Sequence, residues 1–275
     1  MTAIELLNEG KAALSEVTDE YELDAWYLFE HATGIARHEY LMDSQITIPD
    51  EKCNIFREYI SKRSKHIPLQ HIVGTQWFMG LEFEVNEHVL IPRQDTEVLV
   101  EEALKVIRDG DKVLDMCTGS GCIIISISKN TKLSEAVGVD VSVDALGVAS
   151  GNAERHDADV KLVQSDLFTE LGGAKYDVIV SNPPYIETEE INHLMPEVRE
   201  HEPMLALDGG ADGLVFYRRI INESGNYLKH GGYLLFEVGH NQADEVCRLM
   251  EEAGFKDVMS IKDLCGIKRV CKGRL

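Results

Sequence analysis

The sequence contains no long apolar run and few basic residues. No stretch approaches the ~20 consecutive apolar residues of a membrane-spanning helix, and the segment from Met1 to Leu14 lacks the basic start and apolar core of an export signal. The 27 Lys and Arg are outnumbered by 48 Asp and Glu, and the net charge of −21 disfavours general capture of phosphate backbones. We therefore expect a cytoplasmic protein without a membrane partner, for which nucleic acid is not a favoured ligand.

Paired cysteines are also lacking. The six cysteines are scattered and form no Cys-x-x-Cys pair, and the histidines share no spacing, so neither a metal site nor a disulfide framework is predicted. We expect reduced, mostly buried thiols. The cysteines are Cys53, Cys117, Cys122, Cys247, Cys265 and Cys271.

A chain of 275 residues exceeds the ~100–200 residues of an average domain, so one large or two unequal domains are expected. Residues 1–68 carry apolar side chains at helical spacing, with Gly34 as a stop signal, and predict a small helical domain. From 69 to 91 the period shortens toward two, which predicts a β-hairpin linker. Residues 92–275 are predicted to form the second domain.

Beyond residue 92, apolar β-type segments alternate with helical ones, which requires right-handed crossovers and a mostly parallel sheet covered on both faces. Strands are expected at Lys112–Met116, Ala136–Asp140, Val160–Gln164, Asp177–Ser181 and Tyr233–Val238, with Val258–Ile261 and Lys268–Cys271 closing the edge antiparallel. Helices are expected at about Asp95–Ile107, Gly121–Lys129, Val143–Arg155, Gly213–Lys229 and Gln242–Ala253. The predicted fold class is α/β, with a Rossmann-like seven-stranded sheet.

The first of these strands ends in a glycine-rich turn. The segment Cys117-Thr118-Gly119-Ser120-Gly121 leads into a helix, where glycines allow close approach of a ligand and the helix start offers unpaired N–H groups. In an open α/β sheet, ligands bind at this carboxyl edge. The third glycine of the dinucleotide fingerprint is replaced by Ile124, and no lysine follows as in a phosphate-binding loop.

The next two strands end in residues suited to a nucleoside. Asp140 stands where a carboxylate reads the hydroxyls of a ribose, although capping of the following helix explains it equally well. Asp166 and Phe168 suit the amino group and face of an adenine, with an N-cap and a core aromatic as alternatives. The ordered combination predicts a nucleoside pocket without a phosphate cradle, which favours S-adenosylmethionine over a dinucleotide.

The fourth strand delivers Asn182-Pro183-Pro184-Tyr185 to the same edge. A planar amide or aryl amine nitrogen is a poor nucleophile, because its lone pair is delocalised. The Asn182 side-chain oxygen and the Pro183 carbonyl can accept both hydrogens of one NH₂ group, and Tyr185 can pack over its plane. Catalysis would then rest on alignment and hydrogen bonding instead of a strong base. A rigid turn is the structural alternative.

This motif resembles that of the class I methyltransferases that modify planar NH₂ groups. Further segments narrow the resemblance, because the chain is similar over nearly its full length to the peptide chain release factor glutamine methyltransferase family, most weakly over the N-terminal helices. The segments that carry this similarity are Pro68–Gly74, Leu90–Glu97, Ser181–Ile186, Glu202-Pro203 and Asp212–Leu214.

The resemblance implies S-adenosylmethionine-dependent methylation of the side-chain amide nitrogen of the glutamine in the Gly-Gly-Gln motif of class 1 release factors. Residues 1–68 would recognise the release factor, and 92–275 would bind the cofactor and catalyse. The implied cofactor-binding residues are Cys117, Thr118, Gly119, Ser120, Gly121, Asp140, Phe168 and Asn182. The implied glutamine-binding residues are Asn182, Pro183, Pro184 and Tyr185, of which Asn182, Pro183 and Tyr185 are catalytic. Cys117 and Gln94 depart from the family pattern, which has Gly and Pro at these places.

Two groups of residues keep alternatives open. Arg93, Asp95 and Glu97 form either a charged lip above the crevice or the start of a helix capped by Asp95 or Thr96, and the helix start is favoured. The loop through Glu202-Pro203 and Gly209-Gly210 either folds over the site or only connects.

A basic cluster stands out from the acidic sequence and is interpreted as a solvated helix end. It comprises Arg57, Lys62, Arg63, Lys65 and His66. Three other functions share parts of the pattern: glutamine methylation of a ribosomal protein, methylation of the exocyclic adenine amine in nucleic acid, and a binding module that keeps the cofactor only as structure. The net charge of −21 speaks against the nucleic-acid function.

Overall fold

A computed structural model describes all residues from Met1 to Leu275 and separates into two compact units. Unit 1 comprises 1–74 and 195–201, and unit 2 comprises 75–194 and 202–275. No helix in either unit is both long and apolar enough to cross a membrane.

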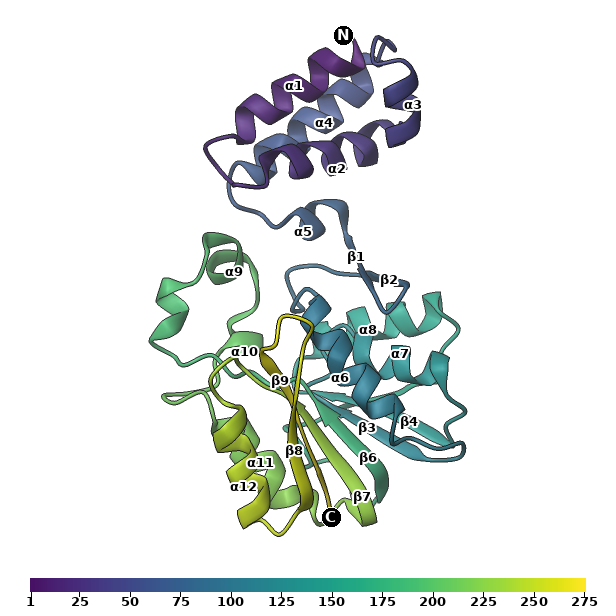
Figure 1. Cartoon of the computed structure of the whole chain (residues 1–275). Helices are drawn as coiled ribbons and strands as arrows, with labels where there is room; N and C mark the ends of the chain where they lie inside the picture. The colour runs from purple at the N-terminus through teal and green to yellow at the C-terminus, as the bar shows by residue number, and fades with distance from the viewer. The chain divides into compact units, whose positions relative to one another are not determined.

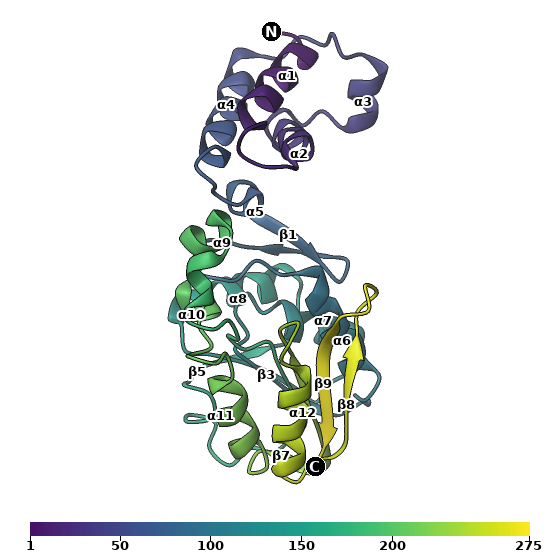
Figure 2. The same ribbon diagram turned by 60° about the vertical axis from the view of Figure 1, so that its left-hand side comes forward.

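Unit 1 is a helical bundle in which α1, α2 and α4 lie side by side (Figures 1 and 2). The first helix begins at a capping box, because the Thr2 side chain accepts from the Glu5 N–H and Glu5 Oε2 accepts from the Thr2 N–H at 2.9 Å. Fully buried Leu28, Phe29 and Phe56 fill its centre. The helices of unit 1 are α1 (Ala3–Leu14), α2 (Tyr21–Thr33), α3 (Arg37–Met42), α4 (Asp50–Arg63), α5 (Leu69–Val73) and α9 (Pro196–His201).

The basic cluster of unit 1 differs in part from its interpretation as a solvated helix end. Arg63 is buried, and its guanidinium contacts Asp24 at 2.7 Å and Glu197 at 3.0 Å. Arg57 pairs with Glu9 at 2.7 Å. These partners lie on other segments of the chain, so spacing within α4 could not indicate them. Arg63 therefore stabilises the bundle internally, whereas the side chains of Arg57 and Lys62 are exposed, as the interpretation expects.

Unit 2 is built on a seven-stranded sheet in the order β5-β4-β3-β6-β7-β9-β8, with the first five strands parallel and β9 and β8 antiparallel at one edge. This confirms the predicted fold class. The strands are β3 (Lys112–Met116), β4 (Glu135–Asp140), β5 (Lys161–Gln164), β6 (Tyr176–Ser181), β7 (Leu228–Glu237), β8 (Lys256–Lys262) and β9 (Lys268–Arg274).

Helices cover both faces of the sheet (Figure 2). Apolar residues of α6 and α7 form one core with β3, β6 and β7, and residues of α11 and α12 form a second core on the opposite face. Burial on both faces explains why the central strands are almost continuously apolar. The helices are α6 (Gln94–Leu104), α7 (Cys122–Asn130), α8 (Val143–Arg155), α10 (Met204–Leu207), α11 (Val215–Ser224) and α12 (Ala243–Glu252), with a 3₁₀ turn at Glu190–His193.

The hairpin predicted across 69–91 is shorter in the structure. It consists of β1 (Thr75–Phe78) and β2 (Leu81–Glu84), and the preceding residues form α5. Pro68 stands at the N-cap of this helix, and Gly74 ends it with a φ of +80°. A start and a stop signal only a few residues apart therefore make one helical turn where the sequence pattern suggested a strand.

Candidate active site at the carboxyl edge of the sheet

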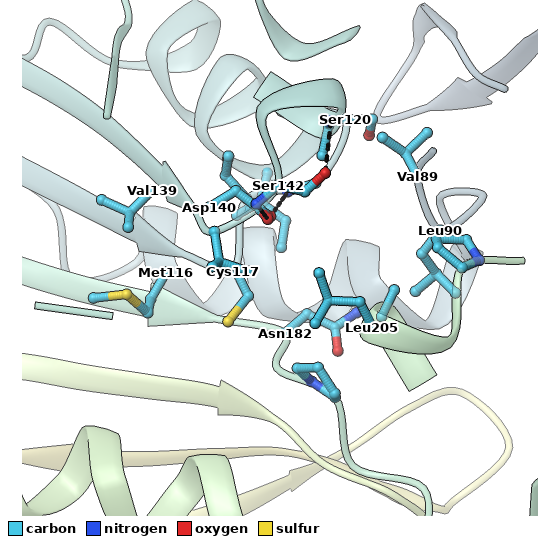
Figure 3. Close-up of a pocket in the computed structure, with 18 of the residues that line it drawn as sticks. Val89, Leu90, Met116, Cys117, Ser120, Val139, Asp140, Ser142, Asn182 and Leu205 are labelled. Atoms are coloured by element: carbon cyan, nitrogen blue, oxygen red, sulfur yellow. Dashed lines mark hydrogen bonds between the residues drawn. The ribbon is translucent and has the colours of Figure 1, made fainter. Parts of the chain in front are cut away.

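The chain order of the sheet reverses at β3 and β6, which are neighbours although β4 and β5 follow β3 in sequence. Such a switch point leaves a crevice at the carboxyl ends of the strands. The ends of β3 and β6 are tied together, because the Ser181 hydroxyl donates to the Met116 carbonyl at 2.7 Å. A cavity of about 980 Å³, including its open mouth, lies here within unit 2 (Figure 3).

The glycine loop forms one wall of the cavity. The Thr118 hydroxyl donates to buried Asp115 at 2.6 Å, and the Gly119 N–H donates to Asp140 Oδ2 at 2.9 Å. Gly121 has a φ of +78°, and a Cβ there would lie 2.9 Å from Ile125 Cδ1. Only glycine fits this position without strain. Cys117 has a φ of +63°, which lies in the left-handed region where glycine is the least strained residue.

Asp140 connects the glycine loop to the start of α8. Its Oδ1 accepts from the Ser142 N–H at 3.0 Å, while the cap itself is Ser142, whose side chain accepts from the Ala145 N–H. Capping by Asp140 is therefore not its role. Burial raises the pKa of Asp140, against the opposing effect of its backbone hydrogen bonds. In Figure 3 its carboxylate lies beside Cys117 at the cavity wall.

Phe168 is not among the residues that line the cavity, and its contact with an adenine face stays a prediction. Its side chain is fully buried and stacks on Tyr227 at 4.5 Å between ring centroids. Leu167 has a φ of +53° and lines the cavity instead, together with Asp166, which pairs with Arg219 at 2.9 Å. The left-handed residue turns the chain, so the aromatic enters the core one position after the cavity wall. This placement matches the core alternative for Phe168.

The Asn182–Tyr185 segment forms the opposite wall. Asn182 and Pro184 line the cavity, whereas Pro183 and Tyr185 are not among its lining residues. The Asn182 Nδ2 donates to the Thr96 hydroxyl at 3.4 Å, and the Tyr185 hydroxyl donates to Glu237 Oε1 at 3.3 Å. Burial strongly raises the pKa of Tyr185, so its hydroxyl stays protonated.

Two segments hold the end of this motif: the loop before α11 and the start of α12. The Gln242 amide donates to the Tyr185 carbonyl at 2.8 Å, and the Gly209 N–H donates to the Ile186 carbonyl at 2.8 Å. A Cβ on Gly209 would lie 2.7 Å from Tyr185 Cα. The loop through Glu202 and Gly209 is therefore more than a connection, because it packs on the motif, and Leu205 also lines the cavity (Figure 3).

The charged residues before α6 have fixed partners. Arg93 occupies the N-cap position without a side-chain cap and pairs with buried Glu202 at 2.7 Å. Asp95 pairs with Arg269 at 2.8 Å, and Glu97 accepts from the Met79 N–H at 2.6 Å. Neither Asp95 nor Thr96 caps the helix as predicted. Arg93 alone of the three lines the cavity.

Sequence reasoning missed three residues that support the motif: Thr96, Glu237 and Gln242. Thr96 lies within the Leu90–Glu97 segment that carried the family resemblance, so a signal was present but was assigned to helix capping. Glu237 ends β7 and Gln242 comes shortly after it, and the carboxyl end of β7 lies beside that of β6. The order of strands in the sheet, which local spacing does not give, was needed to find them.

The residues that line the cavity fit a nucleoside that carries an apolar extension. Asp140 supplies a carboxylate at one side, Gly119 lines the cavity with open space where a Cβ would stand, and apolar side chains such as Ile123 and Leu205 line the rest. Arg93 is the only Lys or Arg on the lining, and its charge is already paired with Glu202. A polyphosphate would therefore find no free cation, whereas S-adenosylmethionine needs none.

Known proteins match this chain in both units. A family model described as the PrmC N-terminal domain matches residues 5–74, and one described as the methyltransferase small domain matches 94–201. A release factor glutamine methyltransferase of Geobacter sulfurreducens is 44% identical over 92% of this chain and 89% of its own length. That of Bacillus subtilis is 37% identical over 98% and 96%.

Among solved structures, a methyltransferase of Pyrococcus furiosus has a TM-score of 0.54 at 18% identity, with 71% of this chain and 89% of that one covered. At this identity the similarity supports the fold alone. The curated relatives instead extend over both units at well above 30% identity. The chain therefore belongs to the release factor glutamine methyltransferase family.

Proposed function

We propose that this enzyme transfers a methyl group from S-adenosylmethionine to the side-chain amide nitrogen of the glutamine in the Gly-Gly-Gln motif of class 1 release factors. The observation that carries the proposal is the placement of Asn182 in one cavity with the glycine loop and Asp140. The names of the relatives supply the substrate class. We place this reaction in the cytoplasm, where release factors act.

In this proposal the glycine loop and Asp140 hold the cofactor. The loop backbone from Cys117 to Gly121 lies against the nucleoside, and the Asp140 carboxylate accepts from the ribose hydroxyls. Ser165, Asp166 and Leu167 surround the base, a role that the sequence suggested for Phe168. When bound, S-adenosylmethionine supplies an electrophilic methyl carbon on a positively charged sulfur.

The opposite wall aligns the glutamine. Because the Asn182 Nδ2 donates to Thr96, the Oδ1 atom is left to accept one hydrogen of the substrate NH₂ group. The Pro183 carbonyl accepts the other, and the neighbouring Pro184 and Tyr185 confine the amide plane. The nitrogen then faces the methyl carbon in line with the bond that breaks. As the new N–C bond forms and the C–S bond breaks, S-adenosylhomocysteine would leave, and the proton of the nitrogen would become acidic enough to pass to water, so no strong base is required.

We further propose that unit 1 recognises the body of the release factor. Support comes from the match of residues 5–74 to a family-specific N-terminal domain model. Binding energy gained away from the reacting amide would place one glutamine in the site. The net charge of −21 favours a protein partner over a nucleic acid.

Mass spectrometry of the release factor tests the function. Purified enzyme, S-adenosylmethionine and a class 1 release factor are mixed, and the Gly-Gly-Gln peptide is expected to gain one methyl group on its glutamine. A release factor with Glu in place of that glutamine is the matched control and should gain nothing. No gain on the glutamine peptide, or equal labelling of the control, contradicts the proposal.

A further inference from the structure

The orientation of the Asn182 amide decides whether it can hold the substrate. An asparagine side chain presents an acceptor at one end and a donor at the other. A substrate NH₂ group needs the acceptor, so Nδ2 must face the protein. In the structure it does, because Nδ2 lies 3.4 Å from the Thr96 hydroxyl oxygen.

Thr96 alone does not fix that orientation. A hydroxyl both accepts and donates, so it pairs equally well with the Nδ2 or the Oδ1 end of Asn182. The choice is made by whatever receives the hydroxyl proton. If a third group accepts that proton, only the oxygen lone pairs of Thr96 remain, and these bind Nδ2 alone.

Glu237 is the acceptor in reach. Its residue is 2% exposed, as is that of Thr96; burial raises the pKa of this carboxyl group, and the nearby Thr96 hydroxyl opposes that rise. In the structure, Glu237 Oε1 receives the Tyr185 hydroxyl at 3.3 Å, and Oε2 has no partner within ordinary hydrogen-bond distance. An ionised carboxylate offers only acceptors. The buried Glu237 carboxyl group therefore lies near two side chains: Thr96, which binds Asn182, and Tyr185.

We propose that Glu237 is a positioning residue that accepts hydrogen bonds from Thr96 and Tyr185, and so directs the Asn182 oxygen toward the substrate amide. This inference rests on the proposed function and deepens it, since it explains how an uncharged acceptor keeps a single orientation. Glu237 itself does not touch the substrate or the cofactor. The fold supports this placement, because the Tyr217 hydroxyl donates to the Glu237 carbonyl at 2.9 Å.

The arrangement predicts a dependence on pH. Burial raises the pKa of Glu237 to about 7, and a protonated carboxyl group could donate to Thr96 and reverse the direction of its hydroxyl. Activity should therefore fall as pH falls through about 7. The titratable and charged groups that face Glu237 from the surrounding elements are Asp95, Cys122, Tyr185, Tyr217 and Arg269.

Glu237→Gln tests the inference with almost no change of volume. The amide donates from one end, so it no longer accepts from both hydroxyls, and kcat should fall by about 10- to 100-fold at pH 8. The KM for S-adenosylmethionine and the affinity for S-adenosylhomocysteine should stay within about twofold, because the cofactor wall is untouched. The wild-type decline in kcat below pH 7 should be lost.

Thr96 offers a matched pair of substitutions. Thr96→Val keeps the shape and removes the hydroxyl, whereas Thr96→Ser keeps the hydroxyl. We expect kcat of the serine variant to exceed that of the valine variant by about tenfold or more. In Thr96→Val the acid limb of kcat should be lost, because no hydroxyl remains for the protonated carboxyl group to reverse. Glu102→Gln, which changes a buried glutamate outside the cavity, should keep the wild-type limb.

A second readout does not need activity. A raised carboxyl pKa means that the folded protein binds the proton more tightly than the unfolded chain does. As the pH rises from 5 to 8, the Tm of the wild type should therefore fall relative to that of Glu237→Gln. Should Glu237→Gln keep the wild-type kcat and acid limb, or should Thr96→Val match Thr96→Ser, the inference is overturned while the proposed function stands. Failure of the wild-type enzyme to methylate the release factor would instead remove the proposed function.

Discussion

Cys117 lines the cavity in a strained backbone conformation. Its φ of +63° lies in the left-handed region, which a residue with a Cβ adopts at a cost of about 1–2 kcal/mol. The neighbouring loop holds the residue there, because the Thr118 N–H donates to the Val139 carbonyl at 2.9 Å and its hydroxyl binds Asp115. The strain is therefore imposed by the loop and not by the thiol.

Two substitutions of Cys117 separate strain from side-chain loss. Cys117→Ala and Cys117→Gly both remove the sulfur, but only glycine relieves the left-handed strain. We expect the glycine variant to be the more stable by about 1 kcal/mol in denaturant unfolding. In an ordinary helical conformation the order would be the reverse. Finding alanine the more stable would show that the residue is not strained.

Asp115 should make stability depend on pH. Its side chain is fully buried, and burial raises its pKa to about 7. The folded state then holds a proton that the unfolded chain releases near pH 4, so stability should fall as pH rises from about 4 to about 7, by up to about 4 kcal/mol. Asp115→Asn should remove this decline. Urea unfolding across that range measures it, with exposed Asp159→Asn as the matched control, and parallel curves for wild type and Asp115→Asn would refute the assignment.

At the scale of elements, the loop before α11 packs tightly against the Asn182–Tyr185 segment. A Cβ on Gly209 would lie 2.7 Å from Tyr185 Cα, and no left-handed φ prevents alanine there. We expect Gly209→Ala to displace the Asn182–Tyr185 segment and to lower kcat by about tenfold or more, with binding of S-adenosylhomocysteine largely kept. Gly173→Ala, with open space around its Cβ, is the control. Equal activity of the two variants would argue against a role for the loop.

Elements were predictable where one local signal dominates. The strand Lys112–Met116 and the helix Val143–Arg155 were placed to the residue, because a short, mostly apolar run and an amphipathic stretch each favour one structure. The short helices α9 and α10 were not predicted, since they are too brief to show a period. The sequence left Phe168 with two alternatives for a related reason, because the left-handed turn at Leu167 leaves no mark in the spacing.

At the scale of the whole molecule, the residues that end the central strands were predictable, but the side chains that reach them from other elements were not. The glycine loop, Asp140 and Asn182 each lie at the end of a strand, so their common edge could be inferred. Thr96 and Glu237 reach the same place from α6 and from β7, and their roles depend on how distant segments pack. The buried partners of Arg63 in unit 1 escaped prediction in the same way.

The proposed reaction depends on two hydrogen-bond acceptors that hold one planar nitrogen. A crystal structure of the enzyme with S-adenosylhomocysteine and a glutamine-containing peptide from a release factor tests it most directly. We predict that the glutamine NH₂ nitrogen lies about 3 Å from both Asn182 Oδ1 and the Pro183 carbonyl oxygen, and faces the cofactor sulfur. A glutamine whose nitrogen points away from these two oxygens, or a cofactor bound outside the glycine loop, would contradict the account.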